Sequence, residues 1–392
     1  MRIALVHDYL VQYGGAERVL EALCEIWPHA PVYTLLHNPD SVHHRFDKQT
    51  VRTSFLQRIP FAKNHHRVFP PLMMIAIEQF NLDYYDVVLS DSSSFAKNVV
   101  TGPDTLHITY CHTPMRYGWD DCQYYTQEFS FPATIKKFVP PLMNYIRMWD
   151  YFSTNGVDRF VANSKFVSTR IRKYYDRSAH VINPPVDVNT FHLAKDGKVE
   201  DYFLLVGRMM KYKKMDLVIE AFNEMKLPLK LVGRGMEIKR LQQIAGPTIE
   251  FLGRVSEEKL REVYSKAQAF LFPQEEDFGI VAIEALASGR PVIALRAGDI
   301  VEHVKEGESG VFFDEQTKEG IIDAVRRFQK IDFDSGYIRD TALHFETEKF
   351  KGKMKQFVEQ EYDKFKNKDF SKEKEYPSSN FQLNNIKSQQ IK

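Results

Sequence analysis

The sequence predicts an α/β protein with two doubly wound domains that face each other across a cleft. Its 392 residues are more than one hydrophobic core usually holds. Short apolar runs rich in β-branched and aromatic residues alternate with longer amphipathic stretches, and this alternation occurs twice along the chain. Apolar strands separated by helices are typical of parallel sheets that are covered on both faces.

The strands and helices are expected in two sets. The first set of strands is Ile3–Val6, Val32–Leu36, Asp86–Ser90, His107–Cys111 and Arg159–Ala162. The second set is Phe203–Val206, Leu229–Val232, Ile249–Leu252, Ala269–Phe272, Pro291–Leu295 and Gly310–Phe313. The clearest helices between the later strands are Asp216–Met225, Glu257–Ala267 and Lys318–Gln329.

The domain boundary is predicted at Asn183–Asp187, because two adjacent prolines there forbid a continued helix. We therefore expect a first domain over residues 1–183, completed by a C-terminal helix over 346–366. The second domain is expected over 184–345. Residues 367–392 are rich in Lys, Asn, Ser and Gln, which predicts a disordered tail.

Composition excludes several functional classes. The 53 basic and 52 acidic residues give a net charge of +1, so a globally basic nucleic-acid binder is not expected. The three cysteines lack metal-ligand spacing and fit a reducing cytoplasm. The apolar run Met1–Val6 is too short for a signal peptide, and no run approaches the roughly 20 apolar residues of a spanning helix. A cytoplasmic protein, at most peripheral to the membrane, is expected.

The most informative segment is Gln274–Pro291, which follows an apolar strand. Gly279 permits close backbone approach, a helix runs to about Ser288, and Gly289 is expected as its left-handed cap. The helix therefore begins at the carboxyl end of a parallel strand, where open α/β sheets bind ligands. Its free N–H groups and positive dipole end suit a diphosphate.

Glu276 and Glu284 lie eight residues apart in this segment, or about 12 Å at helical rise. One carboxylate can thus reach a sugar beyond the phosphates and the other a ribose, because hydroxyl groups donate hydrogen bonds to carboxylates. The alternative, a solvated Glu284, is disfavoured because Val281, Ile283 and Leu286 make the helix largely buried. A buried carboxylate needs a partner.

A second signal is an apolar strand, Leu204–Val206, that runs directly into Gly207 and Arg208, with Lys213 five residues later. Arginine offers a planar fork for phosphate oxygens and lysine a compact charge. Arg208 and Lys213 are therefore expected to neutralise a leaving diphosphate. The neighbouring lysines at 211 and 214 fit a solvated basic loop.

These motifs, taken together over residues 1–366, resemble family 4 of the retaining glycosyltransferases, which have the two-domain GT-B fold. The similarity is greatest to GDP-mannose-dependent mannosyltransferases of O-antigen and exopolysaccharide assembly. Two residues depart from the family pattern: Lys214 replaces a glycine, and Arg234 replaces an acidic residue. The matching motifs are Gly14–Arg18, Cys111–Tyr117, Asn163–Phe166, Val206–Lys213, Val232–Gly235, Phe251–Val255, Glu276–Glu284 and Ala297–Glu302.

The resemblance implies a donor site in the second domain. Arg208 and Lys213 would bind the diphosphate, Glu284 the ribose and Glu276 the hexose. The remaining donor contacts would be the backbone amides of Phe278, Gly279, Ile280 and Val281, the base contacts of Arg254 and Val255, and the Gly14 and Gly15 loop that closes from the first domain.

On the acceptor side, the resemblance places His112 near the reacting carbon, so the catalytic set would be His112, Arg208, Lys213 and Glu276. A purely structural, hydrogen-bonded His112 is a serious alternative. Arg116 and Tyr117 would contact the acceptor, although packing roles are equally compatible with their positions.

The resemblance also implies retention of the anomeric configuration by front-face displacement, in which the leaving phosphate helps to deprotonate the acceptor. The co-substrate would be a nucleotide-diphosphate sugar, and no cofactor or catalytic metal is expected. The only Asp-x-Asp triplet, Asp332–Asp334, lies in a polar connection and is interpreted as surface.

Several alternatives stay open. A UDP-hexose-dependent transferase, a sugar-nucleotide epimerase of the same fold, and an inactive sugar-nucleotide-binding subunit share these features. A dinucleotide-dependent oxidoreductase is excluded, because no Gly-x-Gly-x-x-Gly follows the first strand.

Two basic clusters beside apolar stretches raise the hypothesis of docking on the inner membrane surface, where lipid-linked acceptors reside. The first interpretation of both stretches is an ordinary amphipathic helix packed on the sheet, and membrane docking is the second. The clusters consist of Lys63, His65, His66 and Arg67, and of Lys136, Lys137 and Arg147.

Overall fold

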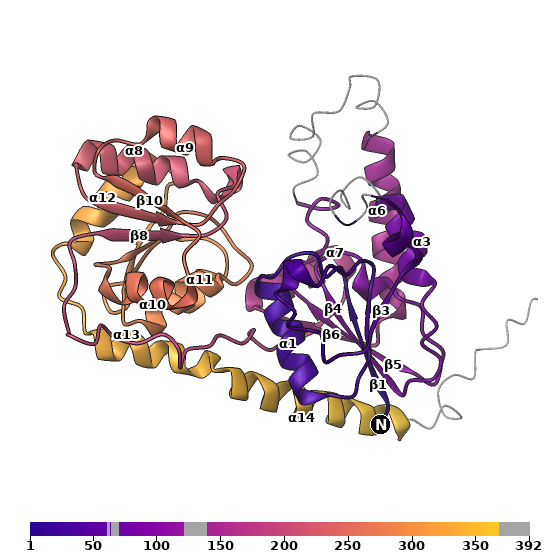
Figure 1. Ribbon diagram of the computed structural model, residues 1–392. Helices are drawn as coiled ribbons and strands as arrows, with labels where there is room; N and C mark the ends of the chain where they lie inside the picture. Colours follow the sequence, from indigo (N-terminus) through magenta and orange to yellow (C-terminus); the bar gives the residue numbers. More distant parts are fainter. Residues whose placement is uncertain (61–62, 64–69, 121–138, 368–392) are drawn as a thin grey trace, which may run out of the picture.

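The computed structural model describes residues 1–60, 63, 70–120 and 139–367, and it contains two parallel sheets (Figure 1). The first sheet has the strand order β3-β2-β1-β4-β5-β6-β7 and the second the order β10-β9-β8-β11-β12-β13. In both sheets the chain starts in the middle, moves to one edge and then returns to build the other half. The two doubly wound domains predicted from the sequence are confirmed.

The first sheet and its helices occupy the N-terminal part of the chain. Their bounds are β1 Ile3–His7, α1 Gly15–Ile26, β2 Val32–Thr34, β3 Val51–Thr53, α3 Pro70–Glu78, β4 Val87–Ser92, β5 Leu106–Cys111, α6 Val139–Ser153, β6 Arg159–Ala162, α7 Lys165–Tyr175 and β7 Ala179–Val181.

The second sheet and its helices follow. Their bounds are β8 Phe203–Val206, α8 Met215–Met225, β9 Leu229–Val232, α9 Ile238–Ile244, β10 Ile249–Gly253, α10 Glu257–Lys266, β11 Phe270–Phe272, α11 Ile280–Ala287, β12 Val292–Leu295, β13 Gly310–Phe313, α12 Lys318–Phe328 and α13 Ser335–Ala342. The last helix is α14, Thr347–Lys366.

All eleven predicted strand segments occur as strands, and those of the second sheet deviate least from their predicted bounds. Most of their residues are buried, as in Phe203–Val206, so the apolar run itself marks the strand, whereas the edge strand β10 is partly exposed. The sequence analysis missed β3 and β7. Both are three-residue edge strands with a partly exposed pattern, which carries little periodic signal.

Helix α14 returns from the second domain and covers the first sheet (Figure 1, yellow). Phe350, Met354, Val358 and Tyr362 recur every four residues, and all four belong to the core cluster that also contains β1, β4 and β5 side chains. An ion pair between Arg159 and Glu361 (Nε–Oε2, 2.5 Å) adds a contact to β6.

The chain crosses between the domains twice, and the two crossings lie side by side. A parallel bridge pairs Val186 with Glu346, and the Val186 amide donates a 2.9 Å hydrogen bond to the carbonyl of Phe345. The side chain of Asn189 donates to Glu346 across the same place. The connection between the domains is thus a narrow double strand of backbone, formed beside the predicted proline boundary.

Some sequence predictions fall on residues that the structure leaves undescribed. The tail from residue 368, the basic residues His65, His66 and Arg67, and Lys136 with Lys137 all lie outside the described residues. No helix within residues 1–60, 63, 70–120 and 139–367 is both long and apolar enough to cross a membrane.

Replacing Met354 with alanine is expected to destabilise the first domain by about 3 kcal/mol, because Met354 is fully buried between α14 and the sheet. Urea denaturation followed by tryptophan fluorescence measures the change. Lys355→Ala on the exposed face of the same helix is the control and is expected to change stability by less than about 0.5 kcal/mol. Equal effects of the two substitutions would contradict the docking of α14.

Candidate active site

The predicted donor residues gather where loops leave the carboxyl ends of β8 and β11, the two adjacent strands at which the second sheet changes direction. Such switch points are where open α/β sheets bind ligands. Gly207 and Arg208 follow β8, and Glu276 follows β11. At this edge the backbones approach closely, because a Cβ placed on Gly233 would lie 1.9 Å from the carbonyl oxygen of Gly207.

Helix α11 begins as the sequence predicts. Its N-cap, Gly279, has φ +86°, and a Cβ there would lie 2.8 Å from the Phe272 ring. Gly289, with φ +68°, ends the helix in the left-handed conformation and confirms the predicted cap. Phe278 is buried against His303 and Phe345, which holds the start of the helix in place.

The first domain approaches α11 directly. A Cβ on Gly15, the first residue of α1, would lie 2.9 Å from Cδ1 of Ile280, the first residue of α11. The N-termini of two helices from different domains therefore face each other at this point. Helix N-termini carry partial positive charge and N–H groups without partners inside the helix, which suits an anion placed between the domains. At α1 the carboxylate of Glu17 already accepts a hydrogen bond from the amide of Gly14.

Glu284 is 2% exposed and has partners from both domains. Arg18 of α1 donates to its Oε1 at 2.8 Å, and the Tyr264 hydroxyl donates to its Oε2 at 3.1 Å. Burial, followed by the charge of Glu284, raises the pKa of Tyr264 far above its ordinary value, so its hydroxyl stays protonated. A buried carboxylate needs a partner, and for Glu284 the structure supplies the charge of Arg18 from the facing domain.

Lys213 is almost completely buried, and its ammonium contacts the carboxylate of Glu276. Burial, and then the positive charges of Arg208 and Arg116, lower the pKa of Lys213 to about 7, while Asp277 opposes this shift. The contact with Glu276 also favours the charged ammonium. Lys213, Arg208 and Arg116 thus lie close enough together for their positive charges to oppose one another. A bound anion would relieve this repulsion.

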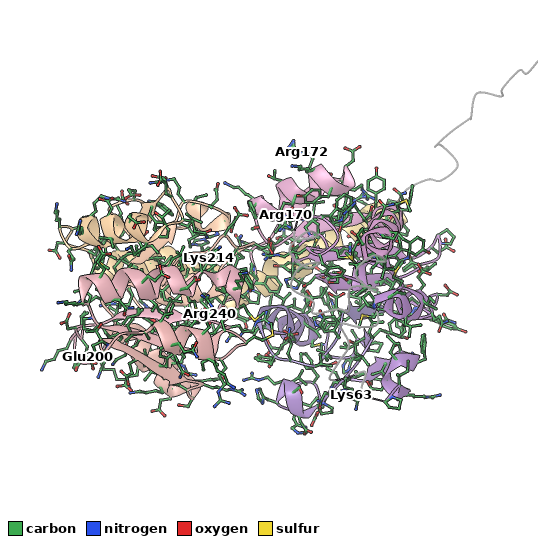
Figure 2. All side chains as sticks on the ribbon, turned by 90° about the horizontal axis from the view of Figure 1, so that it is seen from above. Lys63, Arg170, Arg172, Glu200, Lys214 and Arg240 are labelled. Atoms are coloured by element: carbon green, nitrogen blue, oxygen red, sulfur yellow. The ribbon has the colours of Figure 1, made fainter. Side chains whose placement is uncertain are left out.

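Asp277 joins the domains beside this cluster. It accepts hydrogen bonds from Arg116 at 2.6 and 3.1 Å and contacts Arg170 of α7, which also contacts Asp120. Figure 2 shows the two domains side by side and labels Arg170 on the first domain. Arg116 thus lies at the boundary between the domains, whereas the Tyr117 ring packs with Phe95 in the first core.

The remaining donor residues lie along the same boundary. Arg254, after β10, donates to His43 of the first domain at 2.8 Å, and Val255 packs against the second core. Arg208 donates to Gln12 at 3.4 Å. A cavity of about 250 Å³ between the domains is lined by Tyr13, Arg18, Glu21, Arg45, Glu257 and Leu260, among others, and of the predicted donor residues none lines it.

His112 directly follows β5 and has a buried partner. Its Nε2 lies 2.5 Å from Oδ1 of Asp91, which is fully buried at the carboxyl end of β4. Asp91 also accepts a hydrogen bond from Nδ1 of His7 at 2.8 Å. The structural, hydrogen-bonded reading of His112 and the catalytic one are both compatible with this contact.

Sequence reasoning missed five residues that organise the site. Arg18 and Glu17 lie within the quoted Gly14–Arg18 motif, but no partner could be assigned to them. His7 ends the apolar strand β1, and Asp91 lies in the polar end of β4; a polar side chain after an apolar run was the signal that could have indicated both residues. Asp277 lies between Glu276 and Glu284 in the sequence, but no role was assigned to it.

Asp332–Asp334, the only Asp-x-Asp triplet, lies before α13. The side chain of Asp334 accepts hydrogen bonds from the amides of Gly336 and Tyr337 and so caps that helix. Within the described ranges, no three His, Cys, Asp or Glu side chains are grouped as metal ligands.

Comparison with known proteins agrees with this geometry. Residues 13–190 match the family model Glycosyltransferase Family 4, and residues 200–330 match the model Glycosyl transferases group 1. Each domain of the chain thus matches one glycosyltransferase family model, and in this the chain resembles the two-domain GT-B glycosyltransferases.

Among curated relatives, an uncharacterized glycosyltransferase of Methanocaldococcus jannaschii is 27% identical over 44% of this chain and 51% of its own length. A D-inositol 3-phosphate glycosyltransferase of Nocardioides is 30% identical over 44% and 46%. The D-rhamnosyltransferase WbpZ of Pseudomonas aeruginosa is 27% identical over 40% and 46%. The chain spans about half the length of the curated relatives it matches.

Two solved structures show the same fold over nearly the whole chain. Anabaena HepE in complex with UDP and glucose has a TM-score of 0.68 at 16% identity, covering 92% of this chain and 99% of that one. The sucrose-phosphate synthase of Thermosynechococcus elongatus has a TM-score of 0.68 at 17% identity, covering 93% and 100%.

Gly279→Ala is expected to destabilise the second domain by about 2 kcal/mol, because alanine is strained at φ +86° and its Cβ would meet Phe272. Gly352→Ala is the matched control: its Cβ would meet no atom within 4 Å in the helix α14, so stability should rise by up to about 1 kcal/mol. Thermal unfolding of both variants measures the difference. A neutral Gly279→Ala would contradict the described start of α11.

Proposed function

We propose that this protein is a retaining glycosyltransferase that transfers mannose from GDP-mannose to a saccharide or lipid-linked oligosaccharide in cell-surface polysaccharide synthesis. The observation that carries the proposal is the group of cationic side chains and helix N-termini at the domain boundary. There Lys213 and Arg208 lie beside Glu276, and the N-termini of α1 and α11 face each other.

The proposed roles rest on the resemblance to family 4 glycosyltransferases, and the positions of the residues at the domain boundary support them. Lys213 and Arg208 bind the diphosphate and stabilise its charge as the glycosidic bond breaks, while the amides of residues 278–281 contact phosphate and sugar. Glu276 leaves the ammonium of Lys213 and accepts hydrogen bonds from hexose hydroxyls. No metal or other cofactor takes part, because lysine, arginine and helix N-termini supply the positive charge.

Glu284 is proposed to bind the ribose hydroxyls, with Arg254 and Val255 against the base. Since Glu284 is paired with Arg18, donor binding shares or displaces that contact. Gly14 and Gly15 close over the phosphates from the first domain. His112 lies on the acceptor side with Arg116 and Tyr117, and the leaving phosphate helps to remove the acceptor proton. These roles for His112, Arg116 and Tyr117 stay predictions.

A UDP-hexose donor is the second candidate. The observation that favours it is that HepE, which shares the fold over 92% of this chain, was solved with UDP-glucose. The two candidates use the same phosphate and ribose groups and differ at the base and the hexose.

Calorimetric titration with GDP, UDP, GDP-mannose and UDP-glucose in EDTA tests the proposal. Tight binding of GDP and GDP-mannose is expected, and Lys213→Ala should weaken GDP binding about tenfold or more through the lost charge-assisted contact. Lys211→Ala, an exposed lysine two residues away, is the control and should retain binding within about twofold.

Hydrolysis of the donor, with water as acceptor, is expected to fall to a small fraction in Glu276→Ala while the thermal unfolding midpoint stays near that of the wild type. A preference for UDP and UDP-glucose would replace the proposed donor. Binding of neither nucleotide, or binding only with added metal, would overturn the proposal.

Proton uptake gives an independent test at pH 8. Burial lowers the pKa of Lys213 to about 7, so part of the Lys213 population is expected to be neutral there in the free protein. A bound diphosphate favours the ammonium and raises the pKa of Lys213, so up to about one proton should be taken up on GDP binding. Calorimetry in Tris and in HEPES, which differ in ionisation enthalpy, measures the number of protons.

Lys213→Met at saturating GDP is expected to abolish the uptake, and Lys211→Met to preserve it. Uptake that persists unchanged in Lys213→Met would assign the proton to another group and contradict the lowered pKa.

A further inference from the structure

Four titratable side chains, Glu17, His7, Asp91 and His112, lie in a connected row in the first domain, and we call this row the relay. They come from β1, α1, β4 and the residue after β5. Nε2 of His112 lies 2.5 Å from Oδ1 of Asp91, and Oδ2 of Asp91 lies 2.8 Å from Nδ1 of His7. Nε2 of His7 lies 3.9 Å from Oε1 of Glu17.

At one end of the relay, Glu17 contacts the glycine loop. Glu17 is the third residue of α1, and its Oε2 accepts a 2.8 Å hydrogen bond from the amide of Gly14. The same carboxylate therefore caps the helix that faces α11 and contacts the ring of His7. At the other end stands His112, which is 13% exposed through its side chain.

Three of the four side chains of the relay are buried. Asp91 is completely buried, and His7 and Glu17 are 2% and 3% exposed. Burial alone would lower the pKa of His7, but its hydrogen bond to Asp91 and the nearby carboxylate of Glu17, 3.9 Å away, raise that pKa to about 10. The two histidines likewise hold the pKa of Asp91 below its ordinary value, against its burial.

The other titratable side chains near Asp91 stay neutral. Burial raises the pKa of the Cys24 thiol to about 12 and that of the Tyr110 hydroxyl well above its ordinary value. The charges inside this part of the domain are therefore an imidazolium at His7 between the carboxylates of Asp91 and Glu17.

This charge arrangement fixes the ring of His112. An ionised Asp91 only accepts hydrogen bonds, so Nε2 of His112 must carry the proton of the 2.5 Å contact. Nδ1 is then the ring nitrogen that remains for substrate. Because Asp91 is held in turn by His7, its carboxylate cannot turn away from His112 without breaking a second buried hydrogen bond.

On the basis of the proposed function, we propose that Glu17, His7 and Asp91 are positioning residues that hold the ring of His112 in one orientation and tie it to the glycine loop over the donor phosphates. The contacts link the donor-side loop to the acceptor-side histidine within one domain. Buried ion pairs are costly compared with apolar packing, so their presence at this place favours an orienting role over a purely stabilising one.

Nitrogen-15 NMR of histidine-labelled protein tests the relay without reference to activity, with signals assigned by His7→Gln and His112→Gln. In the wild type at pH 8, His112 should show a protonated, hydrogen-bonded Nε2, and His7 should show two protonated nitrogens. Asp91→Asn should shift both sets of signals. In Glu17→Gln, which retains the cap to Gly14, the His7 ring should lose its charge at lower pH than in the wild type.

Ser90→Ala is the matched control. Ser90 precedes Asp91 on β4 and is equally buried, but its hydroxyl contacts Nε2 of His107 at 2.9 Å instead of either histidine of the relay. Its substitution should leave the His7 and His112 signals in place.

The catalytic readout is release of GDP from GDP-mannose and of UDP from UDP-glucose, with water as the acceptor. Asp91→Asn is expected to lower kcat about tenfold or more while the donor KM changes less than about threefold. Glu17→Gln should lower kcat less, and Ser90→Ala should retain it within about twofold.

Unchanged ring signals of His112 in Asp91→Asn, or an unchanged kcat in a variant whose His112 signals have shifted, would overturn the relay. If Asp91→Asn does not fold, Glu17→Gln decides by the same two readouts. Failure of the wild type to bind GDP or UDP would instead overturn the proposed function, while the ring signals still decide whether the relay exists.

Discussion

The buried carboxylate of Glu284 is the group on which the arrangement of this molecule most depends. A carboxylate with 2% exposure needs compensation, and its compensating charge, Arg18, comes from the other domain. The same helix start that places Glu284 also brings Ile280 against Gly15. The same residue, Glu284, therefore forms a contact between the domains and part of the proposed ribose site.

This sharing has an energetic consequence. Arg18 with Glu284, and Arg116 and Arg170 with Asp277, hold the domains together through groups next to the proposed donor site. A ligand that takes the carboxylate of Glu284 weakens a contact between domains, and one that bridges both sides replaces it. Donor affinity and the relative position of the domains are then linked by thermodynamic reciprocity.

The sequence predicted the sheets well because most of their strands contain a short, predominantly apolar run. Strands β8, β9 and β13 have the predicted bounds, and Gly289 has the predicted conformation. The edge strands β3 and β7 escaped because three half-exposed residues carry no period. Within the site, Lys213, Glu276 and Glu284 could be selected because glycines and strand ends stand beside them.

The partners of those residues were beyond reach. The contact of Arg18 with Glu284 depends on the rotation between two domains, which no local pattern encodes. His7 and Asp91 come together because β1 and β4 are neighbours in register, with His7 opposite Asp91. Their proximity follows from strand order, and 84 residues separate them in the chain. Such pairs can be predicted only when the order of the strands in the sheet is known.

The position of α14 has a consequence for synthesis of the chain. Its four core residues, from Phe350 to Tyr362, fill the first domain, whereas the second domain lies entirely between β7 and this helix. During translation the second sheet is complete before the first core has received its last layer. The apolar side chains of the first domain that α14 covers therefore lack this packing partner until the helix itself has been synthesised.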